Sequence, residues 1–279
     1  EALERVLRSH RPAGFVLEPI QGEGGVVVPP PGYLAAAQAL CKKHGTLLIL
    51  DEIQTGLART GALFAYELEG VMPDVLCLGK SLGGSLFPIS ATLTRPDLQR
   101  RAYGTMERFD LHGTTFSGNA LACAAALATL DVIDEQKLAA RAAERGSRML
   151  SALKTALAEH PIVTDVRGRG LLLGIELGPS TTDEGWLNQV LPGVVRTVAR
   201  GVLGQWLALR LLERGIICQP ASQRWEVLKI TPPLTLTEEE ADRVVRELTD
   251  LLGDYRDLLR VLKDAGQRLG TQVLRDFQF

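Results

Sequence analysis

The sequence predicts an α/β protein in which a mainly parallel sheet is flanked by helices and followed by a smaller α+β domain. Three short apolar runs have the length of buried strands: residues 15–20, 46–50 and 75–78. The connections between them are long enough for crossovers, which join parallel strands. We place the large domain at residues 1–155, the small domain at 156–253 and a helical extension at 254–279.

The composition indicates a globular protein whose partners are small molecules. The 279 residues are 46% hydrophobic, and 33 acidic and 31 basic residues leave a net charge of −2. This balance, without long runs of like charge, argues against binding to nucleic acid or to an anionic membrane. The four cysteines lack the spacing of a zinc site or a disulfide framework, so we expect no metal and reduced thiols in a cytoplasm.

The expected elements of the large domain alternate between strands and helices. A glycine-rich turn at residues 21–25 ends the first strand. Residues 33–44 form a helix whose apolar face carries Leu34, Ala37, Leu40 and Cys41. Beyond the third strand we expect a strand at 88–93 and a short helix at 95–103.

A polar turn at residues 112–119 is followed by two helices. Its hydroxyl groups and backbone N–H groups suit an anion such as a phosphate. We interpret His112 as a packed or hydrogen-bonded loop residue. Helix 120–133 is apolar nearly all round, so we expect it to lie in a core or at a subunit contact. The amphipathic helix 137–160 leads out of the large domain.

The small domain is expected to open with two strands around a glycine turn at residues 168–170. We interpret Arg167 and Arg169, beside that turn, as solvated flanking charges. A helical block at 187–214 ends at Gly215.

Two further strands are expected at residues 216–218 and 227–230. Thr237 and Glu240 have the spacing of a capping box for a helix at 238–252. The tail from residue 254 is expected to be helical and to dock onto the body or onto a missing segment.

Two charged residues follow neighbouring strands of the predicted sheet. Asp51 ends the second apolar run, and Lys80 follows the third. Because ligands of open α/β sheets bind at the carboxyl ends of strands, we expect the two side chains to share a site. The run 79–81 resembles the end of a Walker A loop, but its first glycine is replaced by Asp74 and the Walker B-like strand comes first, so a nucleoside triphosphatase is not supported.

A carboxylate and a lysine in this arrangement suit pyridoxal 5′-phosphate (PLP). The lysine amine forms a Schiff base with the cofactor, and the carboxylate keeps the pyridine nitrogen protonated. Burial lowers the basicity of a lysine readily, which favours nucleophilic and proton-transfer roles. Gln54 could donate to the ring oxygen of the cofactor, and the hydroxyl-rich turn could contact its phosphate.

Six segments together resemble the class III (ornithine aminotransferase-like) PLP-dependent aminotransferases. The similarity follows the family's order over most of residues 12–252, in LEPIQGEGG (17–25), LLILDEIQTGLARTG (47–61), PDVLCLGKSLGGSLFPISA (73–91), HGTTFSGNALACAAALATLDVI (112–133), VRGRGLLLGIEL (166–177) and KITPPLTLT (229–237). The resemblance implies a PLP-dependent fold of type I and a transferase that moves an amino group.

The resemblance also implies roles for single residues. Lys80 would be the covalent and proton-transferring lysine, Asp51 the partner of the pyridine nitrogen and Gln54 a contact of the phenolic oxygen. Thr115, beside Thr114 in the hydroxyl-rich turn, would bind the phosphate of the cofactor in the neighbouring subunit, which implies a homodimer. Glu23 matches the glutamate that pairs with a substrate-gating arginine.

This chain departs from the family pattern at two points. Lys229 stands where the family normally has that arginine, so a bidentate clamp on a substrate carboxylate becomes a single point charge. The change favours an amine, diamine or aldehyde substrate in at least one half-reaction. The family's N-terminal portion is also absent from the chain, so we expect these residues alone to be inactive. The alternative is a truncated, non-catalytic interaction module with the aminotransferase fold.

Overall fold

Contacts divide the chain into two compact units. The computed structural model describes residues 1–178, 192–256, 260–261, 263–264 and 266–268. Unit 1 comprises Glu1–Gln21 and Val28–Ala143, and unit 2 comprises Gly22–Val27 and Glu144–Phe279. The division lies inside helix α5 (Leu138–Leu157), before the boundary that we placed at residue 155. The short segment Gly22–Val27 also groups with unit 2, although its neighbours in sequence belong to unit 1.

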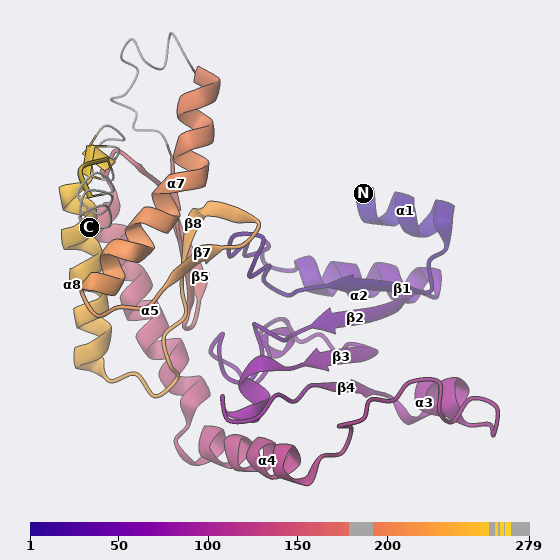
Figure 1. The fold of residues 1–279 in the computed structure, drawn as a ribbon. Coiled ribbons are helices and arrows are strands. Elements are labelled where there is room, and N and C mark those ends of the chain that lie inside the picture. Colours follow the sequence, from indigo (N-terminus) through magenta and orange to yellow (C-terminus); the bar gives the residue numbers. More distant parts are fainter. Residues whose placement is uncertain (179–191, 257–259, 262, 265, 269–279) are drawn as a thin grey trace, which may run out of the picture. The chain divides into compact units, whose positions relative to one another are not determined.

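Unit 1 is built on a four-stranded sheet with the strand order β1-β2-β3-β4 (Figure 1). Its strands are β1 (Gly14–Leu17), β2 (Leu47–Asp51), β3 (Val75–Leu78) and β4 (Ala91–Thr94). The first three strands run parallel, and β4 pairs antiparallel with β3. The predicted mainly parallel sheet is therefore confirmed.

Helices accompany this sheet in the predicted order. The α-helices of unit 1 before α5 are α1 (Ala2–His10), α2 (Tyr33–His44), α3 (Pro96–Tyr103) and α4 (Ala120–Glu135), and the short 3₁₀ helices are η1 (Ala65–Glu69) and η2 (Lys80–Gly83). Helix α2 packs against β2 and buries Leu34, Ala37 and Cys41, three of the four residues of its predicted apolar face. It ends at Gly45, whose φ of 66° is left-handed and suits glycine.

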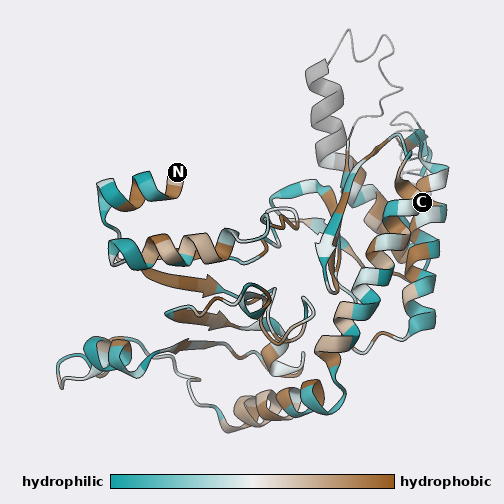
Figure 2. Ribbon diagram, turned by 180° about the vertical axis from the view of Figure 1, so that it is seen from behind, coloured by the Kyte–Doolittle hydropathy of each residue, from teal (hydrophilic) through white to brown (hydrophobic). Residues whose placement is uncertain are grey.

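Helix α4 is buried on only one of its faces in this chain. Ala122, Ala126 and Ile133 are buried, but Leu121 is 64% exposed and Leu127 is 63% exposed. Figure 2 shows α4 coloured mostly as hydrophobic. The prediction that α4 lies in a core or at a subunit contact therefore stays a prediction.

Unit 2 is built on an antiparallel sheet with the strand order β5-β6-β8-β7. Its strands are β5 (Val163–Arg169), β6 (Leu172–Leu177), β7 (Gln219–Ala221) and β8 (Arg224–Ile230). The strand predicted at 216–218 was wrong: pairing begins at Gln219, which lies opposite Lys229. Farther along the chain from β8 come Pro232 and Pro233, which have no N–H group to extend the ladder.

The described α-helices of this unit are α5, α7 (Pro192–Glu213) and α8 (Glu238–Asp254). Helix α7 packs against β6, β7 and β8, and α8 packs against α7. The capping box of α8 is confirmed, since the Thr237 hydroxyl accepts from the Glu240 amide and the Glu240 carboxylate accepts from the Thr237 amide. In the described part of the tail, Tyr255 and Val261 are buried. The rest of the predicted tail, and residues 187–191 of the predicted helical block, lie outside the described residues. No helix among the residues described is long and apolar enough to cross a membrane.

The connection between β2 and β3 is anchored by a buried carboxylate, Glu52, which directly follows Asp51. Glu52 is 1% exposed. Its Oε2 accepts hydrogen bonds from the Thr55 hydroxyl and the Ala65 amide, each at 2.8 Å, and its Oε1 accepts one from the Tyr66 amide at 2.9 Å. Burial raises the pKa of Glu52, although these three donors oppose the rise. One side chain thus ties the chain after β2 to the start of η1.

We expect Glu52→Gln to lower the free energy of unfolding by about 1–3 kcal/mol, because the new NH₂ group must face one of the two backbone N–H donors. Urea unfolding of the whole chain at neutral pH measures this loss. The folded chain holds the Glu52 proton more tightly than the unfolded chain. Its contribution to stability is therefore fully present below the unfolded-state pKa and is lost as the pH rises through the folded-state pKa. The difference between parent and variant should shrink over that pH range.

Glu135→Gln is the matched control, because Glu135 is exposed at the end of α4. This variant should unfold like the parent at each pH. A Glu52→Gln chain as stable as the parent at neutral pH, or a difference that grows with pH, would contradict the anchoring role of Glu52.

Candidate active site

The site on unit 1 lies at the carboxyl ends of two parallel neighbouring strands. Asp51 is the last residue of β2 and lies opposite Cys77 of β3. Strand β3 ends at Leu78, and Lys80 begins η2 two residues later. The parallel pairing that was predicted for these strands is confirmed, and it places both charged residues at the same edge of the sheet.

The carboxylate of Asp51 is oriented by the backbone that follows it. Its Oδ1 accepts a hydrogen bond from the amide of Ile53 at 2.9 Å, and the side chain is half-buried. Gln54 is also half-buried, in the turn that leaves β2. The strand alternation sends Glu52 to the opposite face, where it meets the donors described above. Asp51 is thus the member of the acidic pair that stays available at the sheet edge.

Lys80 combines an exposed side chain with a left-handed backbone. Its φ is 45°, a conformation that costs free energy in residues other than glycine and is concentrated at functional sites. The 3₁₀ helix that it starts packs against α4 and buries Leu82 and Gly83. The packing of η2 against α4 therefore supports the strained position of Lys80, whose side chain is exposed.

The predicted phosphate-binding turn, residues 112–119, is exposed throughout. The Thr114 amide donates to the Ser117 hydroxyl at 3.3 Å, and the two hydroxyl oxygens lie 3.1 Å apart. Thr115 lies in the same turn, with its side chain exposed. His112 is hydrogen-bonded as predicted, with its Nδ1 3.2 Å from the Tyr103 hydroxyl. The turn presents hydroxyl groups that an anion could bind.

The two predicted substrate residues form an ion pair inside unit 2. Lys229 lies on β8 and is 3% exposed, and its Nζ donates to Oε1 of Glu23. Oε2 of Glu23 accepts from the Ser222 amide at 2.8 Å, and its carbonyl oxygen accepts from the Gln223 amide at 3.2 Å. Glu23 is therefore fixed to the turn between β7 and β8, with Lys229 as its counter-ion.

One prediction about charge was wrong: Arg167 is not a solvated flanking residue. Its side chain is only 18% exposed and forms ion pairs with Asp165 and Glu176. Burial by itself lowers the pKa of Arg167, but the two carboxylates raise it, and the net shift is upward. The alternation along β5 separates Arg167 from the buried Val166, but the partners of Arg167 include a segment about 140 residues away in sequence, which no local pattern reveals.

Unit 2 also contains an apolar cavity of about 330 Å³ between the ends of α7 and β8 and the helix α8. Cys218 lines it, and burial raises the pKa of this thiol to about 12, so the thiolate that reacts is not formed at neutral pH. Among the described residues, no group of His, Cys, Asp and Glu is placed to hold a metal ion. The ends of β2 and β3, not this cavity, therefore carry the residues that suit catalysis.

The chain was compared with known families and solved structures. Residues 1–252 match the family model described as aminotransferase class-III. An ornithine aminotransferase from Toxoplasma gondii ME49 is 38% identical, with a TM-score of 0.77 over 90% of this chain and 53% of that one. The acetylornithine aminotransferase from Elizabethkingia anophelis is 36% identical, with a TM-score of 0.78 over 91% of this chain and 58% of that one.

A second structure of the Toxoplasma gondii ornithine aminotransferase, 39% identical with a TM-score of 0.76, has PLP at partial occupancy in its active site. It too is matched over 90% of this chain and 53% of its own length. The chain thus spans a little over half the length of these solved proteins. Because the family match extends over nearly the whole sequence and the sheets agree with fold type I, we conclude that this chain belongs to the class III aminotransferases, whose cofactor is PLP.

Proposed function

We propose that this chain carries the catalytic residues of a PLP-dependent transaminase that moves an amino group from an amine or amino acid to an aldehyde or keto acceptor. The observation that carries the proposal is the parallel pairing of β2 with β3, which sets Asp51 and Lys80 at one sheet edge. Family membership supports transamination in general. The residue roles and the substrate class are part of the proposal.

The residues at this edge fit the chemical groups of PLP. A half-buried carboxylate, oriented by the Ile53 amide, suits a protonated pyridine nitrogen, and the exposed Lys80 amine suits the cofactor's aldehyde. Gln54 would donate a hydrogen bond to the phenolic oxygen. When bound, PLP supplies an electron sink for the negative charge that develops on the substrate carbon. Asp51 would keep the ring nitrogen charged, which strengthens that sink.

Lys80 would have two tasks in turn. Its amine would hold the cofactor covalently and, once a substrate amine has replaced it, would move a proton between the substrate carbon and the cofactor. Both tasks need a neutral amine, whose basicity a nearby cation or desolvation lowers. The short η2 helix would keep the amine within reach of the cofactor during both tasks.

A second copy of the chain would complete the site. Thr115, with Thr114 beside it, would donate hydroxyl hydrogen bonds to the cofactor phosphate of the partner. The exposed turn that holds these threonines leads directly into α4, with its outward apolar face. Burial of this face in a homodimer would remove apolar area from water and bring the turn to the partner.

Lys229, paired with Glu23, would influence which substrates bind. A lysine offers a carboxylate one point charge instead of the fork of an arginine, and Glu23 already neutralises that charge. We therefore propose an amine, diamine or aldehyde as the substrate of at least one half-reaction. Because residues 1–279 span little more than half of the related enzymes, we expect them to be inactive in transamination on their own.

Cofactor attachment tests the proposal directly. The chain is incubated with PLP, borohydride is added to make the lysine–cofactor bond permanent, and the labelled peptide is located by mass spectrometry. We expect the label on Lys80. Lys80→Ala should lose at least about tenfold in labelling, because the reacting amine is removed.

Lys137 is the matched control, since it is also exposed and also has a positive φ, of 51°. Lys137→Ala should leave labelling of Lys80 unchanged. Equal labelling of both lysines would sink the assignment of Lys80. A chain that takes up no PLP at all would instead favour the alternative, a non-catalytic interaction module.

The apolar face of α4 makes a prediction about assembly. Leu127→Glu should shift the chain from dimer toward monomer in sedimentation velocity, because a charge would be buried at the contact. The dissociation constant of the dimer should rise at least about tenfold. Ile217→Glu is the control, since Ile217 is 88% exposed in unit 2. A parent chain that stays monomeric at high concentration would count against the shared site.

Substrate selection at Lys229 is tested by ligand binding. In calorimetric titrations, Lys229→Arg should bind 2-oxoglutarate about tenfold more tightly, because the guanidinium can donate to Glu23 and to a second carboxylate at once. Binding of an uncharged aldehyde should not change. The exposed Lys154 of α5 provides the control variant Lys154→Arg. Equal affinities in parent and Lys229→Arg would remove Lys229 from the substrate site.

A further inference from the structure

The segment Gly22–Val27 belongs to unit 2 and has an unfavourable backbone. The amides of Gly25 and Val26 donate to the Gly22 carbonyl at 3.2 and 3.1 Å, which closes a tight turn. Gly25 has a φ of 106° and Val26 a φ of 52°. A positive φ is rare for a β-branched residue and persists only where surrounding contacts impose it. Something outside the segment must therefore hold this turn.

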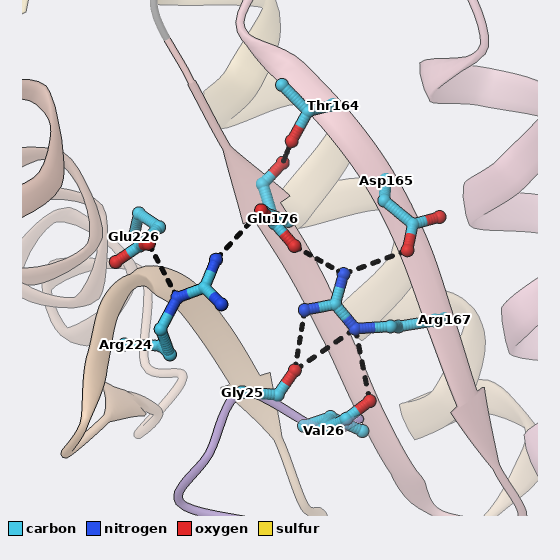
Figure 3. Close-up of polar contacts among 8 residues, drawn as sticks. All are labelled: Gly25, Val26, Thr164, Asp165, Arg167, Glu176, Arg224 and Glu226. Atoms are coloured by element: carbon cyan, nitrogen blue, oxygen red, sulfur yellow. Dashed lines mark hydrogen bonds and ion pairs between the residues drawn. The ribbon is translucent and has the colours of Figure 1, made fainter. Parts of the chain in front are cut away.

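Arg167 on β5 is the side chain that holds the turn (Figure 3). Its Nη2 donates to the Gly25 carbonyl at 2.6 Å, and its Nε donates to the Gly25 and Val26 carbonyls, each at 3.1 Å. One guanidinium thus binds the carbonyl oxygens of both residues with positive φ. The planar fork of an arginine makes this possible, whereas a lysine would offer a single ammonium group.

The guanidinium is fixed in its turn by two carboxylates. Nη1 of Arg167 donates to Asp165 at 2.8 Å and to Glu176 at 2.5 Å. Glu176 also accepts from Arg224 at 3.1 Å, and Arg224 donates to Glu226 at 2.6 Å, so charges of opposite sign alternate across β5, β6 and β8 (Figure 3). Such a half-buried network holds Arg167 in one orientation.

The turn held by Arg167 lies beside the Glu23–Lys229 pair. Val26 is fully buried against Gly174 of β6, where an added Cβ would lie 2.9 Å from the Val26 Cβ. Gly174 is the register partner of Lys229 on β8. Glu23 precedes Gly25 by two residues and reaches Lys229 from the same segment. Glu23 is held by Ser222, Gln223 and Lys229 as well as by this turn, so a loosened turn would strain its pairing with Lys229.

We infer that Arg167 is a positioning residue: it holds the strained Gly25–Val26 turn so that Glu23 stays paired with Lys229. The consequence is that Arg167 sets how far Glu23 neutralises the charge of Lys229. This consequence rests on the proposed function, in which Lys229 selects the substrate. Loss of the Arg167 contacts would loosen the turn next to Glu23 and weaken its pairing with Lys229, whose charge would then attract the carboxylate of a ligand more strongly.

Hydrogen exchange tests the positioning role without any activity of the chain. In Arg167→Lys, the Gly25 and Val26 amides should exchange at least about tenfold faster than in the parent, because the turn loses its hydrogen bonds to the guanidinium. The control Arg148→Lys also weakens a two-carboxylate contact in unit 2, with Glu238 and Asp242, and should leave these amides unchanged. Unchanged exchange in Arg167→Lys would overturn the inference.

A second variant covers the case in which Arg167→Lys does not fold. Glu176→Gln keeps Arg167 but removes the charge of one of its partners, so it should accelerate exchange of the same two amides by a smaller factor. Folding is checked for each variant by circular dichroism. No acceleration in folded Glu176→Gln would count against the network as the support of the turn.

Ligand binding then tests the link to Lys229. Arg167→Lys should bind 2-oxoglutarate several-fold more tightly than the parent, as Glu23→Gln should, because each leaves the charge of Lys229 without its full counter-ion. In a Glu23→Gln background, Arg167→Lys should have no further effect. A purely structural role for Arg167 would give equal effects in both backgrounds and would overturn the coupling.

The two proposals fail in different ways. If no variant binds 2-oxoglutarate but Arg167→Lys still accelerates exchange, the substrate role of Lys229 is wrong and the positioning of the turn is supported. If Glu23→Gln binds 2-oxoglutarate more tightly but amide exchange is unchanged in Arg167→Lys, the substrate role of Lys229 stands and the positioning role of Arg167 is wrong.

Discussion

Strands β2 and β3 pair in parallel, from Ile49 opposite Val75 to Asp51 opposite Cys77, and the candidate site depends on this register. Parallel strands end at the same edge, so the pairing gives Asp51 and Lys80 a common location. The buried Glu52 then fixes the chain that leaves β2, through donors up to 14 residues away. A shift of one residue in this strand would exchange Asp51 and Glu52 between the core and the sheet edge.

In unit 2, charged side chains that are removed from water are closely paired with charges of opposite sign. Lys229 is almost completely buried and has Glu23 as its counter-ion. Arg167 is mostly buried between two carboxylates and two carbonyl oxygens. Burial of an ion is costly unless such partners are present, so each pair ties together segments that are distant in sequence. The same contacts that stabilise unit 2 also decide where Glu23 lies.

Much of the architecture was predictable because local patterns determine it. The apolar face of α2 follows helical spacing, and the α8 capping box was found at Thr237 and Glu240. Two errors have the same origin, in properties that depend on other parts of the fold. A strand at 216–218 needs a ladder partner, and the burial of Arg167 needs the carboxylate of Glu176 on a neighbouring strand. Neither requirement is visible in a local pattern.

By itself, the sequence determined the family, the mainly parallel sheet and the residue types at the strand ends, because short motifs and the hydrophobic period encode these features. It also showed that a lysine stands at position 229. Only the tertiary structure decided that Gly22–Val27 groups with unit 2, that Lys229 is buried against Glu23 and that Arg167 holds the turn beside them. These contacts join residues about 140 to 206 positions apart, so their partners are set by the packing of whole elements.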